Sequence, residues 1–95
     1  VVWRFGPGGG GAGKAAKLVR AKALLDACAG LTPGMRMLEV AIAQPGLECT
    51  YDLVLYAEFD DAAALDAYQN HPQHLAVKPF IGAVRLERQC MDYQT

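Results

Sequence analysis

Two different hydrophobic periods divide the first half of the chain. Residues 1–5 are β-branched and aromatic, which predicts a short strand, and residues 14–29 carry apolar positions at helical spacing, with Gly30 as a C-terminal cap. At 36–43 the period falls to two, which predicts a second strand. The helical stripe consists of Leu18, Ala21, Leu24, Leu25 and Cys28. One face of the second strand carries Arg36, Leu38, Val40 and Ile42, and the other carries Met37, Glu39, Ala41 and Ala43.

The second half repeats strand, helix and strand. Residues 51–59 alternate and predict a third strand, and a helix capped by Asp60 or Asp61 follows through Asn70. Pro72 excludes a continuous helix and suits the first turn of a new short helix at about 72–81, before a last strand at 84–93. The inward stripe of the first of these helices is Ala62, Leu65 and Tyr68.

A glycine-rich stretch at 6–13 separates the first strand from the first helix and predicts a loop. Residues 8–15 match the spacing of a phosphate-binding P-loop, but Ala15 stands where that motif needs Ser or Thr as a magnesium ligand. A chain of 95 residues is also too short for the parallel sheet of a P-loop nucleotidase. We therefore interpret the stretch as a linker, with a weak anion contact at the helix N-terminus left open.

The order β-α-β-β-α-β, with a broken second helix, predicts one α+β domain over residues 1–95. In this ferredoxin-like arrangement, a four-stranded antiparallel sheet carries both helices on one face. Val54 and Tyr56, with either Leu38 and Val40 or their neighbours, would then stand on the uncovered face. We expect two copies to pack these faces together as a homodimer, a dimeric α/β barrel.

Composition, net charge and cysteine spacing argue against several classes of partner and site. Hydrophobic residues make up 53% of the chain and the net charge is -1, without a basic cluster, which argues against nucleic acid and membrane surfaces as partners. Cys28, Cys49 and Cys90 are widely spaced, which argues against a disulfide scaffold or a zinc site and favours a reducing, cytoplasmic protein. We expect Cys28 to be an inert buried thiol. The chain starts without Met, and we expect that a few residues precede Val1.

Tyr68 and His74 are the residues that could carry chemistry. Tyr68 follows Leu65 by three residues and should point toward the sheet, where a buried phenol needs a hydrogen-bond partner. The reversal at Pro72 makes His74 a candidate for that partner. His74 would lie near the third position of the following helix, where the helix dipole and Lys78 disfavour imidazolium, so a neutral imidazole could act as a general base.

Three stretches, 31–40, 51–60 and 67–75, together with the closing Met91-Asp92-Tyr93, resemble the stress-responsive A/B barrel domain family. The segment Tyr-x-x-His-Pro-x-His is the most specific part, and the likeness is good over 31–95 and loose over 14–29. Members often have a His in the first strand and a polar loop before the first helix, where this chain has its glycine run.

The resemblance implies a site as well as a fold. The family includes plant polyketide cyclases, whose Tyr and His in this motif correspond to Tyr68 and His74. By that likeness, His74 would remove a proton between two carbonyls while Tyr68 steadies the enolate, without a metal or organic cofactor. The pocket would lie between sheet and helices, with Leu65, Phe80 and His71 beside it.

Three functions remain open at this point. The first is a domain that binds a small apolar or aromatic molecule without catalysis, and the second is a cofactor-independent cyclase, isomerase or lyase acting on an enolisable substrate. The third is a structural assembly protein. A metal held by His71 and His74 is disfavoured, because the sequence places no carboxylate to complete the site. Other polar and aromatic positions indicate core, interface or solvated contacts: Trp3, Tyr51, Tyr56, Arg85, Glu87, Arg88 and Asp92.

Overall fold

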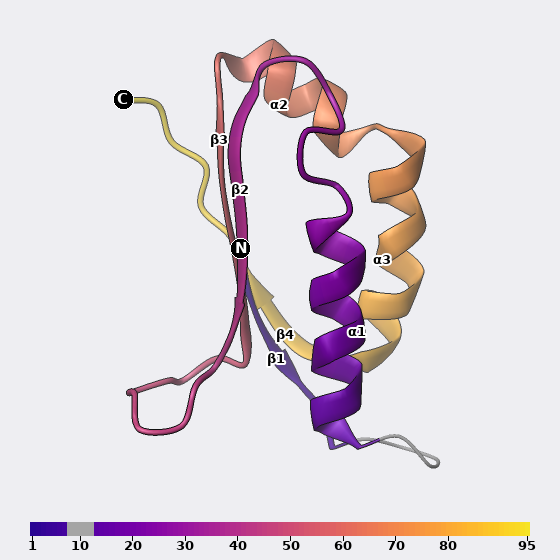
Figure 1. Cartoon of the computed structure of the whole chain (residues 1–95), viewed down its shortest axis with the longest axis vertical. Coiled ribbons are helices and arrows are strands. Elements are labelled where there is room, and N and C mark those ends of the chain that lie inside the picture. The colour runs from indigo at the N-terminus through magenta and orange to yellow at the C-terminus, as the bar shows by residue number, and fades with distance from the viewer. Residues whose placement is uncertain (8–12) are drawn as a thin grey trace.

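The computed structural model describes residues 1–7 and 13–95 and has the expected α+β architecture. The strands form one antiparallel sheet in the order β2-β3-β1-β4, and the helices cover one of its faces (Figure 1). This confirms the ferredoxin-like fold. Most of the glycine-rich stretch with the P-loop spacing lies outside the described residues. The elements are β1 (Val2–Phe5), α1 (Lys14–Asp26), β2 (Met35–Ile42), β3 (Leu53–Phe59), α2 (Ala62–Gln69), α3 (Pro72–Val84) and β4 (Arg85–Gln89).

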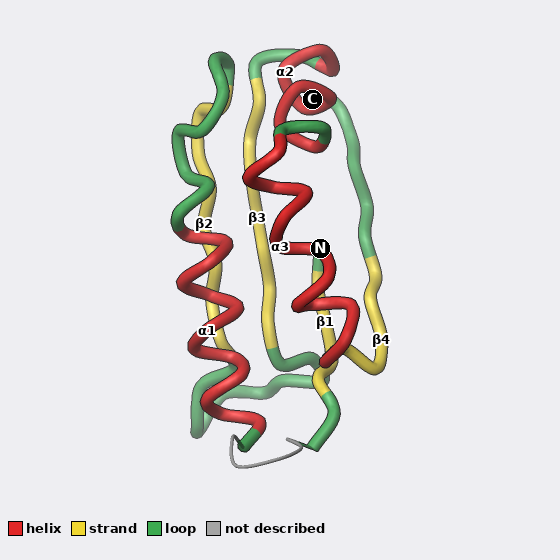
Figure 2. The backbone as a smooth tube through the Cα atoms, turned by 90° about the vertical axis from the view of Figure 1, so that its right-hand side faces the viewer, coloured by secondary structure: helices red, strands yellow, loops and turns green. Residues whose placement is uncertain are grey.

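The core lies between the sheet and the helices. Figure 2 shows α1 in front of β2, and α3 in front of β3 and β1. Leu18, Ala21, Leu25 and Cys28 of the predicted stripe are buried, and so is Trp3. Burying a large apolar side chain contributes about 1.5–3 kcal/mol, so this layer supplies most of the stabilisation.

The other face of the sheet is uncovered in the single chain. Val40 is buried on the helical side, so its neighbours in β2 turn outward, and Met37 is 40% exposed. Val54 and Tyr56 of β3 are 38% and 42% exposed. Since Ala41 pairs with Val54 and Glu39 with Tyr56, these side chains form a strip on the open face, in which Met37, Val54 and Tyr56 are the large apolar residues and Glu39 carries a charge.

The strands differ in length, and this opens one end of the sheet. β1 is short, and the Leu55 amide donates to the Val1 carbonyl at 2.8 Å. Among the described residues, the part of β3 after Leu55 pairs with β2 alone. β4 ends at Gln89, opposite Val2, so the predicted strand through residue 93 is wrong. Residues 90–95 continue as an irregular segment.

Two helix boundaries also differ from the prediction. α1 ends at Asp26 instead of residue 29. The amides of Cys28 and Ala29 donate to carbonyls three residues back, each at 3.0 Å, and so close a turn before Gly30. α3 continues to Val84 and takes in positions that we expected in a loop or strand. Both changes leave the order of elements intact.

The inward face of α2 is shifted from the predicted one. Asp61 is the N-cap and accepts from the Ala64 amide at 2.8 Å, which leaves Ala62 exposed in the first turn. Ala64 is the buried residue and lies against Gly34, where an added Cβ would be 2.7 Å from the Ala64 Cβ. Gly34 has φ of 85°, so both conformation and space require glycine.

Candidate functional site

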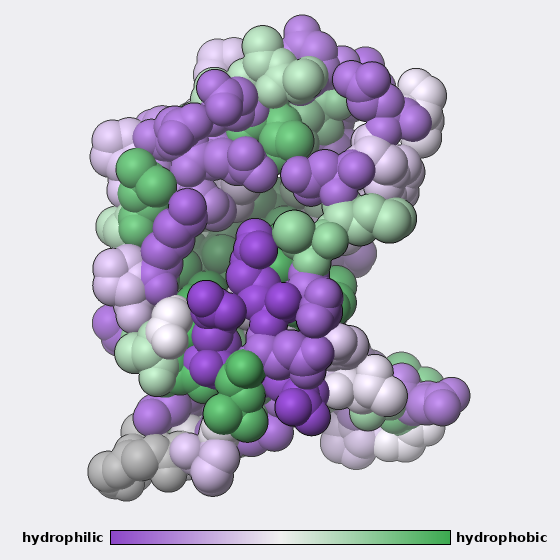
Figure 3. All heavy atoms as spheres, turned by 180° about the vertical axis from the view of Figure 1, so that it is seen from behind, coloured by the Kyte–Doolittle hydropathy of each residue, from purple (hydrophilic) through white to green (hydrophobic). Residues whose placement is uncertain are grey.

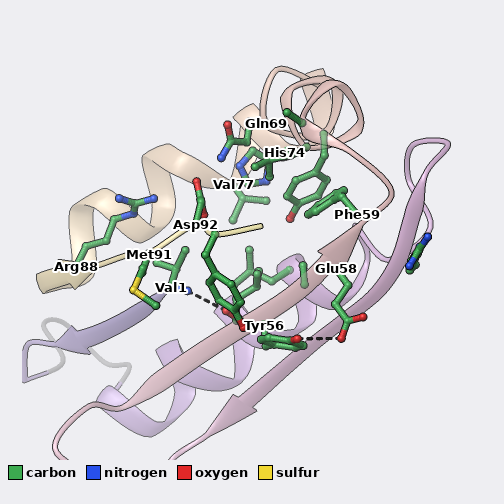
Figure 4. A pocket seen from close by; sticks show the side chains of 18 of the residues that line it. Val1, Tyr56, Glu58, Phe59, Gln69, His74, Val77, Arg88, Met91 and Asp92 are labelled. Atoms are coloured by element: carbon green, nitrogen blue, oxygen red, sulfur yellow. Dashed lines mark hydrogen bonds between the residues drawn. The ribbon is translucent and has the colours of Figure 1, made fainter. Parts of the chain in front are cut away.

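A cavity of about 1260 Å³ lies at the end of the sheet where β3 extends beyond β1. Its walls come from β3, α2, α3, β4 and the segment after β4. Figure 3 shows a recess on this side, with a hydrophobic interior and a largely hydrophilic rim. Figure 4 shows Phe59 from β3, His74 and Val77 from α3, Arg88 from β4 and Asp92 from the last segment around the same space.

α3 sets the position of His74. His71 is the N-cap, its Nδ1 accepts from the Gln73 amide at 3.1 Å, and Pro72 occupies the first helical position. His74 is therefore the third residue of the helix, as predicted. Lys78 and Gly82 follow at spacings of four and line the same cavity, while Val77 beside them is buried.

Tyr68 forms the base of the site. It is 3% exposed, and its ring packs between Phe59 and His74, with centroid distances of 5.4 and 4.4 Å. The expected hydrogen bond to His74 is absent: Tyr68 Oη and His74 Nδ1 are both buried, and neither has a partner among the described residues. The two rings are instead in tilted contact, with an interplanar angle of 46°.

The surroundings fix both protonation states at neutral pH. Burial lowers the pKa of His74 from its ordinary 6.5, and the charges of Lys78 and Arg88 lower it further. Burial raises the pKa of Tyr68 to about 12, and Cys28 adds to this effect. His74 is therefore a neutral imidazole and Tyr68 a protonated phenol. Because Nδ1 is the buried nitrogen, Nε2 is the one that can face the cavity.

The other predicted site residues separate into two groups. Leu65 lines the cavity, on the wall formed by α2. His71 and Phe80 are not among the lining residues: the His71 side chain caps α3, and the Phe80 ring carries the Arg20 guanidinium 5.3 Å from its centroid.

Sequence reasoning missed part of the wall. Lys78 and Gly82 could have been found from their spacing after His74, since residues four apart share a helix face. Arg85 and Arg88 also line the cavity, but they come from β4. No local pattern shows that this strand returns beside α3.

The cysteines and acidic residues define no second centre within the described residues. Cys28 is buried and free, burial raises the pKa of its thiol, and Sγ contacts the Leu24 carbonyl at 3.6 Å. Cys49 and Cys90 are exposed and free. Across residues 1–7 and 13–95, no group of three or more His, Cys, Asp or Glu is placed to hold a metal ion. No helix in those ranges is long and apolar enough to cross a membrane.

The fold and cavity define an α+β domain with a ligand-sized space at one end of its sheet, which extends from the helices to Tyr56 and Glu58 of β3. The family model of the stress responsive A/B barrel domain matches residues 1–95, so the chain belongs to that family. The comparison with curated proteins found no match.

Two solved structures share the fold. A dimeric protein of unknown function with a ferredoxin-like fold from Bacteroides fragilis NCTC 9343 is 24% identical, with a TM-score of 0.81, over 99% of this chain and 90% of that one. A dimeric ferredoxin-like protein of unknown function from Thermobifida fusca YX is 17% identical, with a TM-score of 0.74, over 90% and 77%.

Proposed function

We propose that this protein is a homodimer and that each chain binds a small apolar or aromatic molecule in the cavity beside Tyr68 and His74. The observation that carries the proposal is the Tyr68 hydroxyl, which belongs to the cavity lining and is buried without a partner among the described residues. A buried polar group without a hydrogen bond costs about 1–3 kcal/mol, and folded proteins keep few of them. A ligand with a polar group over an aromatic body offers Tyr68 a partner and covers the apolar wall.

Gly82 provides a direct test of binding. An added Cβ there meets no atom within 4 Å, so Gly82→Leu should fill part of the cavity without straining α3. The probe is N-phenyl-1-naphthylamine, a neutral dye that fluoresces in apolar surroundings. We expect the natural protein and the control Ala83→Leu, on an exposed position of the same helix, to bind the dye, and Gly82→Leu to lose binding at least about tenfold. Equal binding by all three proteins would place the dye elsewhere and contradict the proposal.

The homodimer rests on the open face of the sheet. Both solved neighbours are described as dimeric, and the strip of Met37, Val54 and Tyr56 leaves apolar side chains about 40% exposed. We infer that a second copy covers this strip. Native mass spectrometry should give the mass of two chains and detect any co-purified organic molecule.

A matched pair of valines tests the interface. Val54→Asp places a charge on the strip and should give monomers, while Val19→Asp, on an outer position of α1 that is 63% exposed, should leave the dimer intact. A monomeric natural protein, or a dimer that survives Val54→Asp, contradicts this interface. Masses above two chains would favour the assembly function.

A second candidate function is cofactor-independent proton abstraction, as in a cyclase, isomerase or lyase. The protonation states favour it: neutral His74 can accept a proton from carbon through Nε2, and protonated Tyr68 can donate a hydrogen bond to the enolate oxygen that forms. The proton passes to His74 and returns from it when the product carbon is reprotonated or the ring closes.

Deuterium exchange measures this step without knowledge of the natural substrate. With ethyl benzoylacetate in D₂O, the catalytic function predicts faster exchange than buffer, with a loss of about 10²-fold or more in His74→Ala. Exchange at the buffer rate, or exchange that is unchanged in His74→Ala, contradicts the catalytic function and leaves ligand binding as the proposal.

A further inference from the structure

Three cationic side chains line the cavity without ion pairs. Lys78 comes from α3, and Arg85 and Arg88 come from β4. Within the described residues, none of the three lies within 4.0 Å of a carboxylate, whereas Arg4, Lys14, Lys22 and Arg36 each form an ion pair. Arg36 also lines the cavity, but Asp60 neutralises it there. Three of the five described Lys and Arg side chains without an ion pair therefore line this cavity, and the other two, Lys17 and Arg20, lie on α1.

The acidic side chains along the same cavity are mostly engaged. Glu58 accepts from the Tyr56 hydroxyl at 2.8 Å, and Asp61 accepts from the Ala64 amide at 2.8 Å. Asp60 pairs with Arg36. Asp92 is the acidic side chain of the lining that has no such partner among the described residues, so it can offset one of three positive charges.

We propose that the ligand of this cavity is an organic anion, an aromatic or alicyclic body with one carboxylate, whose charged group lies between Lys78 and Arg88 beside His74. The inference rests on the proposed binding function and names the class of molecule that the same site selects. An apolar body fits the wall of Phe59, Val77 and Ile81, and the carboxylate completes the positive rim.

The position of His74 supports this assignment. The two charges that act on its imidazole, Lys78 and Arg88, are both positive and come from different elements. Both positive charges would stabilise a carboxylate beside them, and they would stabilise the enolate oxygen of the catalytic alternative in the same way. A Lys and an Arg on two elements also fix the direction of a planar anion, because one anchors a charge and the other can donate two parallel hydrogen bonds.

A pair of probes of nearly equal shape isolates the charge. Isothermal titration calorimetry compares 2-naphthoate with 2-naphthamide, which is neutral. We expect naphthoate to bind about tenfold more tightly, and Lys78→Gln and Arg88→Gln each to weaken naphthoate about three- to tenfold while naphthamide is unchanged. Lys17→Gln, on α1 and outside the lining, is the matched control and should change neither affinity.

The outcomes separate the two proposals. If both probes bind equally, or if Lys78→Gln weakens both alike, the anion assignment is wrong while the binding function stands. If neither probe binds at millimolar concentration, the binding function itself is contradicted. Added salt gives an independent check, since raising ionic strength from about 0.05 to 0.5 M should weaken naphthoate and leave naphthamide unchanged.

Discussion

Replacing Tyr68 by Phe should stabilise the unliganded protein while impairing its site. The phenol ring packs against Phe59 and His74, and Phe preserves both contacts. The change removes a hydroxyl that is buried without a partner, a state that costs about 1–3 kcal/mol. We expect a gain of about 1 kcal/mol, which raises the Tm of a domain this small by about 4–8 °C.

Thermal and urea unfolding of Tyr68→Phe provide the measurement. The control is Tyr51→Phe, outside the cavity and the strip on the open face, whose hydroxyl donates to Glu87 at 3.3 Å and whose loss should lower stability by about 0.5–1 kcal/mol and not raise it. A destabilisation of Tyr68→Phe by about 1 kcal/mol or more would show that the Tyr68 hydroxyl is hydrogen-bonded in solution, and would contradict the claim that it is buried without a partner.

Three further predictions address the fold and the histidine. Burial and nearby cations lower the folded-state pKa of His74 below 6.5, so the unfolded chain binds the His74 proton more readily than the folded chain does. The stability that depends on neutral His74 is therefore complete above pH 6.5 and is lost as pH falls through the folded-state pKa. Urea unfolding from pH 7.5 to 5 should show a fall in the free energy of unfolding, and His74→Gln should reduce that fall. Gly34→Ala should destabilise the protein more than Gly46→Ala, by about 1 kcal/mol or more. Both glycines have positive φ, but the new Cβ meets Ala64 only at position 34. Equal losses of unfolding free energy in urea would contradict the close approach of Gly34 to Ala64. Leu25→Ala, at a side chain 2% exposed, should cost about 2–5 kcal/mol in the same assay, and a loss below about 1 kcal/mol would contradict its place in the core.

The features that the sequence predicted correctly are those set by residues close together in the chain. The period of two predicted which residues share a face in β2 and β3, and it turned Val54 and Tyr56 outward as in the structure. It left open which face of β2 points inward, and the structure buries Val40. Pro72 divided the second helix where the structure divides it, and the same break makes His74 the third residue of α3. These features depend on neighbours within a few positions along the chain.

Features that depend on distant partners were not predictable in this way. The last strand stops at Gln89, which pairs with Val2, and nothing in residues 90–93 signals that limit. Arg88 lines the cavity because β4 pairs with β1 at the edge of the sheet, a pairing between segments far apart in the sequence. The tilted ring contact of Tyr68 and His74, in place of the expected hydrogen bond, depends on how α2 and α3 pack together, which the local sequence does not show.

The most direct test of the central claim is the location of bound ligand, followed by amide chemical shifts in ¹⁵N-labelled protein during titration with 2-naphthoate. The largest saturable shifts should occur at Tyr68, His74 and Lys78, with little change at Val19 on the outer face of α1. Saturable shifts centred on Val19 or on Leu47 in the β2–β3 connection, with Tyr68 and His74 unmoved, would contradict the account.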